Sequence, residues 1–316
     1  MAGPIFRQGL WLLLLLVGLC SSLLGMVVDY WIDVGLGVRH DVLTLTVDHP
    51  VARLLLWLGW SVCLCCGAVW VTRNYSPEAV GSGIPQMKAI LAGGINSSRA
   101  EAYLSWRCLV VKAVGLVFAK VAGLSIGKEG PWVHISAALA HNVANWPSFA
   151  PLCLHRESWR QIISAGFAAG TAANFGAPIG GVLFSIEVTA THYPVSSYIK
   201  AFACSVSGAF FLRFFGGTSS HKKDGGGYNS GGALFTMLDD NGSVQVFHHE
   251  RHELFAFALL GLCAGVAGAG FVTFHRLVVV RFRPLKSDHP YLLSAAVAAL
   301  SALLSFPEGT YVYAPT

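Results

Sequence analysis

Long stretches without a single charged residue limit most strongly how this chain can fold. The segments from Leu10 to Val28 and from Leu54 to Val71 contain no Asp, Glu, Lys or Arg. Charged residues make up only 12% of the 316, whereas soluble domains carry about 25%. Because a helix crosses a bilayer with about 20 apolar residues, we expect an all-α, polytopic membrane protein.

Five further apolar segments are candidates for helices that span the membrane or enter it part way. They cover about residues 108–126, 165–191, 195–215, 254–280 and 291–306. The first run of the chain is longer than the apolar core of a typical signal peptide and lacks an A-x-A-like cleavage site, so we interpret it as a membrane helix. The net charge of +5 has no clustered basic face, and nucleic-acid binding is therefore not expected.

Glycine and proline interrupt the apolar segments at three places. Backbone N–H and C=O groups without hydrogen-bond partners are so costly in lipid that such breaks persist only where protein buries them or where they line a cavity. In transporters, broken helices direct their positive N-terminal ends at anionic substrates. The breaks therefore indicate a transport pathway. They are Gly81-Ser82-Gly83-Ile84-Pro85, Gly127-Lys128-Glu129-Gly130-Pro131 and Gly176-Ala177-Pro178-Ile179-Gly180-Gly181.

A helix that starts at such a break offers a site for a small anion. Its first turn has unpaired N–H groups and a partial positive charge of about half an electron. Glycine lets a ligand approach the backbone closely, Ser82 adds a hydroxyl donor, and Lys128 would attract anions toward the entrance. Because no full positive charge would trap the anion, it would be released quickly, as conduction requires.

Glu129 has two interpretations. Its carboxylate is itself an anion, so it could occupy the anion site and block the pathway until it is protonated or displaced. Alternatively, it only stabilises a helix dipole, by about 0.3–1 kcal/mol. The residues alone leave both interpretations open. The G-x-x-x-x-G-K-[ST] pattern of phosphate-binding loops does not occur, so we do not expect an enzyme.

No metal or cofactor is expected either. Cys63, Cys65 and Cys66 lie within one apolar run and lack the paired C-x-x-C spacing of zinc sites. Three histidines between residues 248 and 252 lie in a Gly-rich polar insertion, which is predicted to be an extramembrane loop. A solvated loop is the preferred interpretation of these histidines.

The three breaks resemble motifs of the CLC family of chloride channels and chloride/proton exchangers. Gly81 to Pro85 resembles its GSGIP motif, Gly127 to His134 resembles GKEGPxxH, and Pro178 to Phe184 resembles PxxGxLF. The motifs have the order and spacing of the family. The resemblance implies the CLC-type broken-helix, inverted-repeat fold, chloride as the transported ion, and an integral position in the plasma membrane or an organelle membrane.

The resemblance also implies roles for individual residues. Ser82 would donate its hydroxyl to a central chloride, and Glu129 would be the gating glutamate. The anion-binding residues would be Ser82, Gly83, Ile84, Lys128, Glu129 and Gly130. The structural residues of the motifs would be Gly81, Pro85, Gly127, Pro131, Pro178, Gly180 and Phe184.

Position 188 bears on the choice between channel and exchanger. Family exchangers usually carry a second acidic residue directly after the Glu of the LFxxE stretch, where it passes protons. In this chain Glu187 is followed by Val188, which cannot carry a proton. The resemblance therefore favours a voltage-gated-type channel for passive chloride transport. A chloride/proton exchanger is the alternative, because a minority of exchangers lack this second acid.

The chain departs from the family pattern after its first half. The GxFxP motif, the late Tyr that pairs with the Ser of GSGIP, and the cytoplasmic CBS pair do not occur. We therefore expect the N-terminal half of the transmembrane domain at 1–215, a Gly-rich loop at 216–253, and a truncated second half at 254–316. A non-conducting subunit that modulates a full-length partner is a further alternative.

The resemblance implies a dimer as well. Helices that match about residues 179–191 and 195–215 contribute to the dimer surface of the family. Both segments are present in this chain. We therefore expect a homodimer, or a dimer with a full-length family member, within the lipid bilayer.

Overall fold

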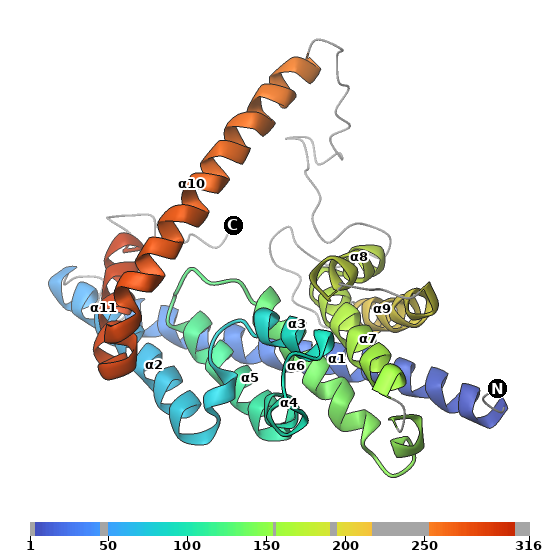
Figure 1. Ribbon diagram of the computed structural model, residues 1–316. Helices are drawn as coiled ribbons and strands as arrows, with labels where there is room; N and C mark the ends of the chain where they lie inside the picture. The colour runs from blue at the N-terminus through green and yellow to red at the C-terminus, as the bar shows by residue number, and fades with distance from the viewer. Residues whose placement is uncertain (1–3, 45–49, 154–155, 190–194, 217–252, 307–316) are drawn as a thin grey trace. The chain divides into compact units, whose positions relative to one another are not determined.

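The computed structural model of the chain describes residues 4–44, 50–153, 156–189, 195–216 and 253–306 (Figure 1). Its internal contacts divide the chain into two compact units. The first comprises residues 1–234 and 295–316, and the second comprises residues 235–294. The regular structure of the described residues is entirely helical, as expected for an all-α protein.

Helices α1 to α9 belong to the first unit, in which short 3-10 turns precede α3 and α7. The second unit contains α10 (Glu253–Asp288) and the start of α11 (Pro290–Leu304), whose remainder belongs to the first unit. The other helices are α1 (Pro4–Thr44), α2 (Pro50–Tyr75), α3 (Ile84–Ala92), α4 (Ser97–Leu104), α5 (Trp106–Val121), α6 (Glu129–Ala144), α7 (Arg156–Phe175), α8 (Pro178–Thr189) and α9 (Val195–Gly216).

Each glycine-rich break is followed by a helix, as the sequence predicts. The helices α3, α6 and α8 begin at Ile84, Glu129 and Pro178. Pro85 and Pro131 also lie in first turns, where proline fits because its missing N–H would have no helical partner. The breaks are therefore helix starts within the protein rather than kinks in continuous spans.

Within the described ranges, four helices are long and apolar enough to cross a membrane, judged by length and composition. They cover residues 8–44, 51–75, 197–215 and 253–288, and α4 with α5, bent by 45°, would count as a fifth. The other expected apolar segments form shorter or less apolar helices. The expected run at 165–191 is split between α7 and α8 at the third break.

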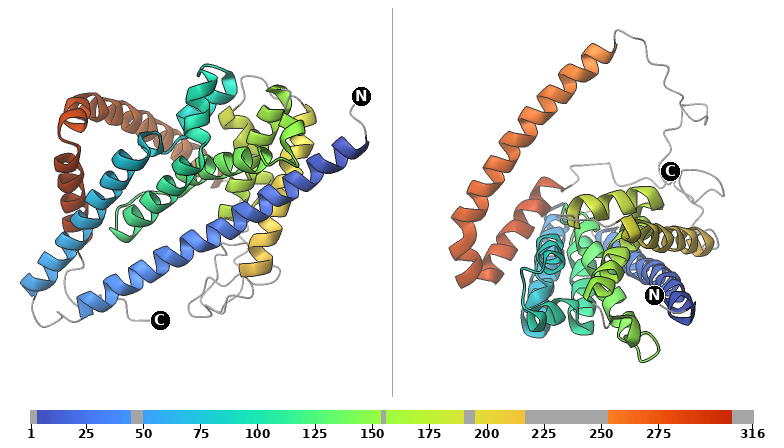
Figure 2. Two further views of the ribbon diagram at one scale, coloured as in Figure 1. Left: turned by 90° about the horizontal axis from the view of Figure 1, so that it is seen from below. Right: turned by 45° about the vertical axis from the view of Figure 1, so that its right-hand side comes forward.

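Helix α1 continues well past the apolar run that predicts it, which ends at Val28. Two charged residues beyond that point have partners elsewhere in the unit. The Asp29 carboxylate pairs with Lys128, and the Arg39 guanidinium packs on the Trp57 ring. Figure 2 shows α1, in blue, running as a long diagonal along α5, α6, α7 and α9, all of which it contacts.

Close packing against α7 buries almost the whole of α6. Residues 132–140 of α6 and 162–173 of α7 are buried. Gly166 permits this approach, because a Cβ at that position would lie 2.9 Å from the Ser136 carbonyl oxygen. A Cβ on Gly170 would collide with the Ser136 side chain. This contact fixes α6, and with it the first turn that carries Glu129.

Candidate anion site

The loop before α3 turns sharply, so that Ser82 lies directly before a helix. Gly81 and Gly83 have φ values of 82° and 85°, in the left-handed region that glycine adopts without strain. Gly83 is the N-cap of α3, and its carbonyl oxygen accepts a hydrogen bond from the Met87 N–H at 2.9 Å. Ser82 is exposed, so its hydroxyl is accessible to a ligand.

Lys112 of α5 holds this loop in shape, a role that the sequence patterns did not reveal. Its side chain is only 4% exposed. The ammonium donates hydrogen bonds to the carbonyl oxygens of Ala79 at 2.9 Å and Gly81 at 2.8 Å. A lysine in the middle of an apolar helix without acidic residues is the signal that could have identified it, because a buried cation needs partners.

The first turn of α6 presents unpaired backbone donors. Lys128 is the N-cap, and Glu129, Gly130 and Pro131 follow. N–H groups at a helix start have no partner within the helix, and Pro131 has no N–H. The donors of this turn are therefore the N–H groups of Glu129 and Gly130. The next N–H, that of Trp132, donates to the Lys128 carbonyl oxygen at 2.9 Å.

The structure brings the first and second breaks together. A Cβ on Gly130 would lie 2.9 Å from Ser82 Cβ and 3.5 Å from Ile84 Cδ1. The Ser82 side chain therefore lies directly against the first turn of α6. Gly83 lies in turn against the ring of His134, with which a Cβ at position 83 would collide. Glycine at 83 and 130 is thus a condition for the contact between the two helix starts.

His134 supports this contact from the interior of the protein. Its side chain is 1% exposed, and Nε2 lies 2.9 Å from the Tyr103 carbonyl oxygen. Because a carbonyl oxygen can only accept a hydrogen bond, Nε2 carries the proton and Nδ1 holds a lone pair. Nδ1 faces the Gly83 backbone. The imidazole therefore positions the loop that carries Ser82.

The Glu129 carboxylate folds back over the loop that precedes α6. A Cβ built on Gly127 would collide with Glu129 Oε2 and would lie 3.1 Å from its Cδ. The carboxylate thus lies beside the helix start, and a methyl group at position 127 would displace it. Both interpretations of Glu129, as a gate and as a group that stabilises the helix dipole, fit this position.

Lys128 forms an ion pair rather than projecting alone toward solvent. Its Nζ lies 2.9 Å from both carboxylate oxygens of Asp29 on α1. This pairing offsets the charge that would draw anions from a distance, since the long-range field follows the summed charge. The attraction of anions by Lys128 stays a prediction, while its backbone forms the N-cap of α6.

The third break is not part of the contact between Ser82 and α6. Gly176 has φ 63°, which turns the chain between α7 and α8. A Cβ on Gly180 would meet Ala177 Cβ at 3.5 Å, and no atom of Ser82 or Glu129 lies within 4 Å of it. The anion site of the described residues is therefore built from two of the three breaks.

Helix α8 packs on α7 and also contacts α3. Pro178 begins the helix, and the Phe184 ring lies 5.9 Å from the Phe167 ring of α7, measured between centroids. The backbone of Val188 belongs to α8, but its side chain lies outside the described residues. The structural role of the PxxGxLF motif is thus visible as packing between these helices.

The described residues contain no group of three or more His, Cys, Asp or Glu side chains placed to hold a metal ion. Cys63, Cys65 and Cys66 lie on α2, and none of the three is part of a disulfide. The histidines between 248 and 252 lie outside the described residues.

Comparisons with known proteins place these features in context. The sequence profile of the family described as voltage gated chloride channel matches residues 62–314. Chloride channel protein 2 of Mus musculus is 33% identical over 306 residues, which cover 95% of this chain and 32% of that protein. Chloride channel protein 1 of Rattus norvegicus is 32% identical over 317 residues, which cover 97% of this chain and 30% of that protein. The chain thus spans about a third of the length of these curated relatives.

A solved structure of a eukaryotic CLC transporter is similar to the chain in fold. The TM-score is 0.80 at 30% sequence identity, and the match covers 96% of this chain and 50% of that chain. The likeness confirms the all-α CLC fold that the sequence motifs predict. The truncation of the second half and the three-part domain division stay predictions.

Proposed function

Because the chain belongs to the CLC family of voltage-gated chloride channels, we propose that it is a channel polypeptide for passive chloride transport. Members of this family are integral, multi-pass membrane proteins, and the long apolar helices of the chain agree with this. In the proposed pathway, Ser82 and the first-turn amides of α6 bind chloride. Glu129 gates access to them.

The observation that carries this proposal is the contact between Ser82 and the first turn of α6. Ser82 Cβ lies 2.9 Å from the place of a Cβ on Gly130, so the hydroxyl and the amides of Glu129 and Gly130 are close enough to share a small anion. The rest of α6 is buried, and an apolar surrounding strengthens the attraction of its partial positive charge. These donors bind chloride although none of them carries a full positive charge. The binding is therefore weak enough for the ion to leave the site.

Glu129 is placed to compete with chloride for these donors. Its carboxylate lies over Gly127, beside the start of α6. The partial positive charge that attracts chloride attracts this carboxylate as well. A neutral side chain at position 129 removes the competitor, so the pathway is expected to open.

Val188 favours passive conduction over coupled proton transport. A proton relay within a membrane is built from titratable side chains, and valine has none. The relatives that are 32–33% identical are named chloride channels, which agrees with this choice. We propose no enzymatic activity and no cofactor for the chain. A chloride/proton exchanger remains the alternative, and the measurement of the reversal potential described below excludes or supports it.

A second copy of the chain, or a full-length family member, is the proposed protein partner. Helices α8 and α9 expose large apolar side chains, and contiguous apolar surface of this kind marks contact with protein or lipid. A chain that does not conduct alone would act as a subunit that modulates such a partner. The exposed side chains include Ile179, Leu183, Tyr198, Ile199, Phe202, Val206, Phe210 and Phe214.

Chloride efflux from liposomes tests the channel and its gate together. Vesicles that contain the purified chain should release chloride when a potassium ionophore balances the charge. Glu129→Gln should release chloride faster and should lose the dependence on pH, because the competing carboxylate is gone. Glu101→Gln, on the exposed surface of α4, is the matched control and should behave as the unaltered chain.

Absence of efflux from all these proteins would contradict conduction by the chain alone. In that case the chain is co-expressed with Chloride channel protein 2 of the mouse. A change in that current would support the subunit alternative. An unchanged pH response in a conducting Glu129→Gln protein would contradict the gating role.

The reversal potential under a pH gradient separates channel from exchanger. A passive chloride channel reverses at the chloride equilibrium potential, whatever the pH on the two sides. Coupling to protons shifts the reversal potential when only the pH gradient changes. Such a shift would overturn the assignment as a passive channel.

A further inference from the structure

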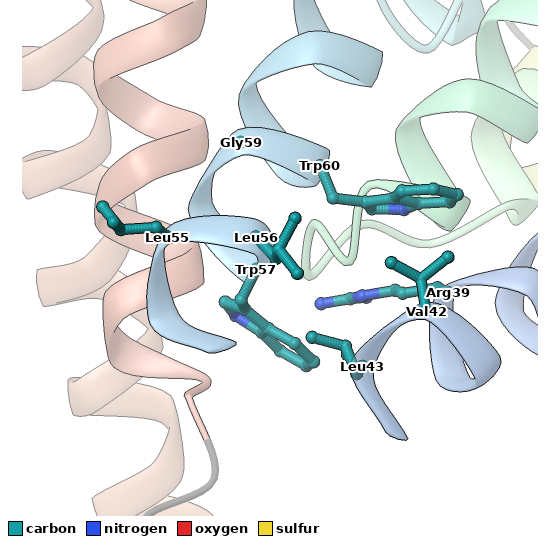
Figure 3. A pocket seen from close by; sticks show the side chains of 8 residues that line it. All are labelled: Arg39, Val42, Leu43, Leu55, Leu56, Trp57, Gly59 and Trp60. Atoms are coloured by element: carbon teal, nitrogen blue, oxygen red, sulfur yellow. The ribbon is translucent and has the colours of Figure 1, made fainter. Parts of the chain in front are cut away.

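The C-terminal end of α1 and the N-terminal part of α2 enclose a cavity whose lining includes neither Ser82 nor Glu129 (Figure 3). Its volume is about 150 Å³, several times the roughly 30 Å³ that one water molecule takes in the liquid. Among the described residues, Arg39 is the one charged residue in the lining. The other lining residues are Val42, Leu43, Leu55, Leu56, Trp57, Gly59 and Trp60.

Arg39 is held between two indole rings. Its side chain is only 8% exposed, and Cζ lies 3.7 Å from the ring centroid of Trp57. Figure 3 shows the ring of Trp60 on the other side of the guanidinium. The indole N–H of Trp57 donates to the Ala302 carbonyl oxygen at 2.9 Å, and that of Trp60 to the Val121 carbonyl oxygen at 3.2 Å. These hydrogen bonds fix both rings, and therefore the position of the guanidinium.

The positive charge of Arg39 has no anionic partner among the described residues. Neither ion pair of these residues includes Arg39, and its Nε is buried without a hydrogen-bond partner. The guanidinium lies against Gly123, just past the end of α5, where a helix dipole offers only partial negative charge. An unpaired buried charge is costly. The buried guanidinium is therefore suited to an anionic ligand.

The cavity lies where two membrane spans end. The candidate span of α1 ends at Thr44 and that of α2 begins at Val51, so this end of the helix pair is expected at one face of the bilayer. Tryptophan is enriched at this depth, and basic pockets between spanning helices bind lipid head groups there. Leu55, which is 63% exposed, extends the apolar wall of the cavity to the outer surface of α2.

We propose that this cavity binds an anionic phospholipid, with its phosphate on Arg39 and its acyl chains along the exposed face of α2. The guanidinium fork matches two oxygens of a phosphate. The lining favours a lipid over free phosphate, because a free ion needs several polar donors and the described lining residues offer only those of Arg39. The glycerol and acyl groups of a lipid instead fit the tryptophan and leucine walls. This site is separate from the proposed chloride pathway and does not depend on it.

Native mass spectrometry of the purified full chain tests the proposal, with phosphatidylglycerol and phosphatidylcholine as probes. The unaltered chain should retain phosphatidylglycerol about fivefold more tightly, the difference that one basic residue makes near a membrane surface. Arg39→Met should abolish the preference, whereas Arg39→Lys, which keeps the charge, should retain part of it. Arg53→Met, which neutralises an arginine of α2 outside the cavity lining, should leave the preference intact.

A measurement on the unaltered chain covers the case in which Arg39 variants misfold. Phosphatidylglycerol with brominated acyl chains should quench indole fluorescence more than brominated phosphatidylcholine at equal content in the bilayer. Inorganic phosphate should not reverse this quenching. Reversal by inorganic phosphate would assign a free-anion site and overturn the lipid.

Three other results would also overturn the proposal. The first is equal retention and equal quenching by the two lipids. The second is a preference that survives in folded Arg39→Met. The third is a preference for phosphatidylglycerol that is absent from the unaltered chain and appears only in Asp48→Asn. This result would show that Asp48, which lies outside the described residues, is the partner of Arg39.

Discussion

Helices α6 and α10 are both apolar, yet their surroundings are opposite. Residues 132–140 of α6 are buried, whereas α10 has no buried residue. Gly166 of α7, which faces α6, has no space for a methyl group, because a Cβ would lie 2.9 Å from the Ser136 carbonyl oxygen. Gly265 of α10 has no atom within 4 Å of its Cβ position. Close packing therefore requires a small residue at position 166, which faces α6, whereas the space around position 265 of α10 would accept a larger one.

The difference indicates that the candidate anion site depends on how α6 is held rather than on how apolar it is. The first turn of α6 meets Ser82 only because α7 and the α3 loop approach at glycine positions. An apolar helix without such contacts could not direct its N-terminal donors at a fixed point. Substitutions at matched positions in the two regions test this dependence.

The largest loss is expected for Gly83→Ala, which alters the contact between the α3 loop and α6. At φ 85° a side chain costs about 1–2 kcal/mol. The methyl group would also collide with His134, and overpacking costs about 1–3 kcal/mol more. The melting temperature of the detergent-purified chain should fall, together with any chloride efflux. Gly261→Ala on α10, with open space around it, is the control. An equal loss there would remove the contrast between the two helices.

Lys112→Met should follow in size, because it removes the ammonium that holds the α3 loop. The carbonyl oxygens of Ala79 and Gly81 lose their donor, and a buried group without a partner costs about 1–3 kcal/mol. Thermal unfolding measures this loss, and amide hydrogen exchange should quicken around Gly83. Lys120→Met is the matched control, because its ammonium reaches one exposed carbonyl, that of Ile126. Similar losses in both variants would refute the special role of Lys112.

Gly166→Ala and Gly265→Ala compare the two regions directly. The first substitution should destabilise the chain by about 1–3 kcal/mol, since α6 and α7 would have to separate. The second should be neutral or stabilising by up to about 1 kcal/mol, because alanine favours a helix over glycine. Melting temperatures in one detergent provide the comparison. A loss at Gly265 would reveal a segment that packs on α10 in the native assembly, and a neutral Gly166 would show that α7 can move.

The smallest effect on stability is expected for Asp29→Asn, which frees Lys128. Both side chains are partly exposed, and pairs of this kind contribute about 0.2–1 kcal/mol, which salt reduces. At low ionic strength, however, the unpaired Lys128 should speed chloride entry. Efflux rates at low and high salt measure this effect, with Asp41→Asn on the exposed side of α1 as the control. Unchanged rates would indicate that Lys128 does not steer anions.

The helix starts of the site were predictable because glycine and proline act locally. Their spacing placed α3 and α6 correctly, and the first turns follow from the residues at positions 84 and 129. The proximity of Ser82 to Gly130 was not predictable from that spacing alone. It depends on contacts of α6 with α7 and α3, which are far apart in the chain.

The supporting contacts were missed for a related reason. Lys112 donates to backbone carbonyl oxygens. Every residue type has such an oxygen, so the sequence cannot indicate which residues are the partners of Lys112. Lys128 and Asp29 are 99 positions apart, and each looks unpaired within its own segment. The charges that follow Val28 suggested the end of a span, whereas tertiary partners allow α1 to continue.

The shortness of α6 has a consequence for how the protein is made. Its 16 residues rise about 24 Å, less than the roughly 30 Å of hydrocarbon that a helix must cross. A newly synthesised α6 therefore has no stable place in lipid until α7 has followed it and covers its face. We expect a ribosome-bound chain that ends before Arg156 to keep Glu129 within reach of water-soluble reagents. Protection would begin only after α7 has been synthesised, so the candidate anion site would form only once both helices are complete.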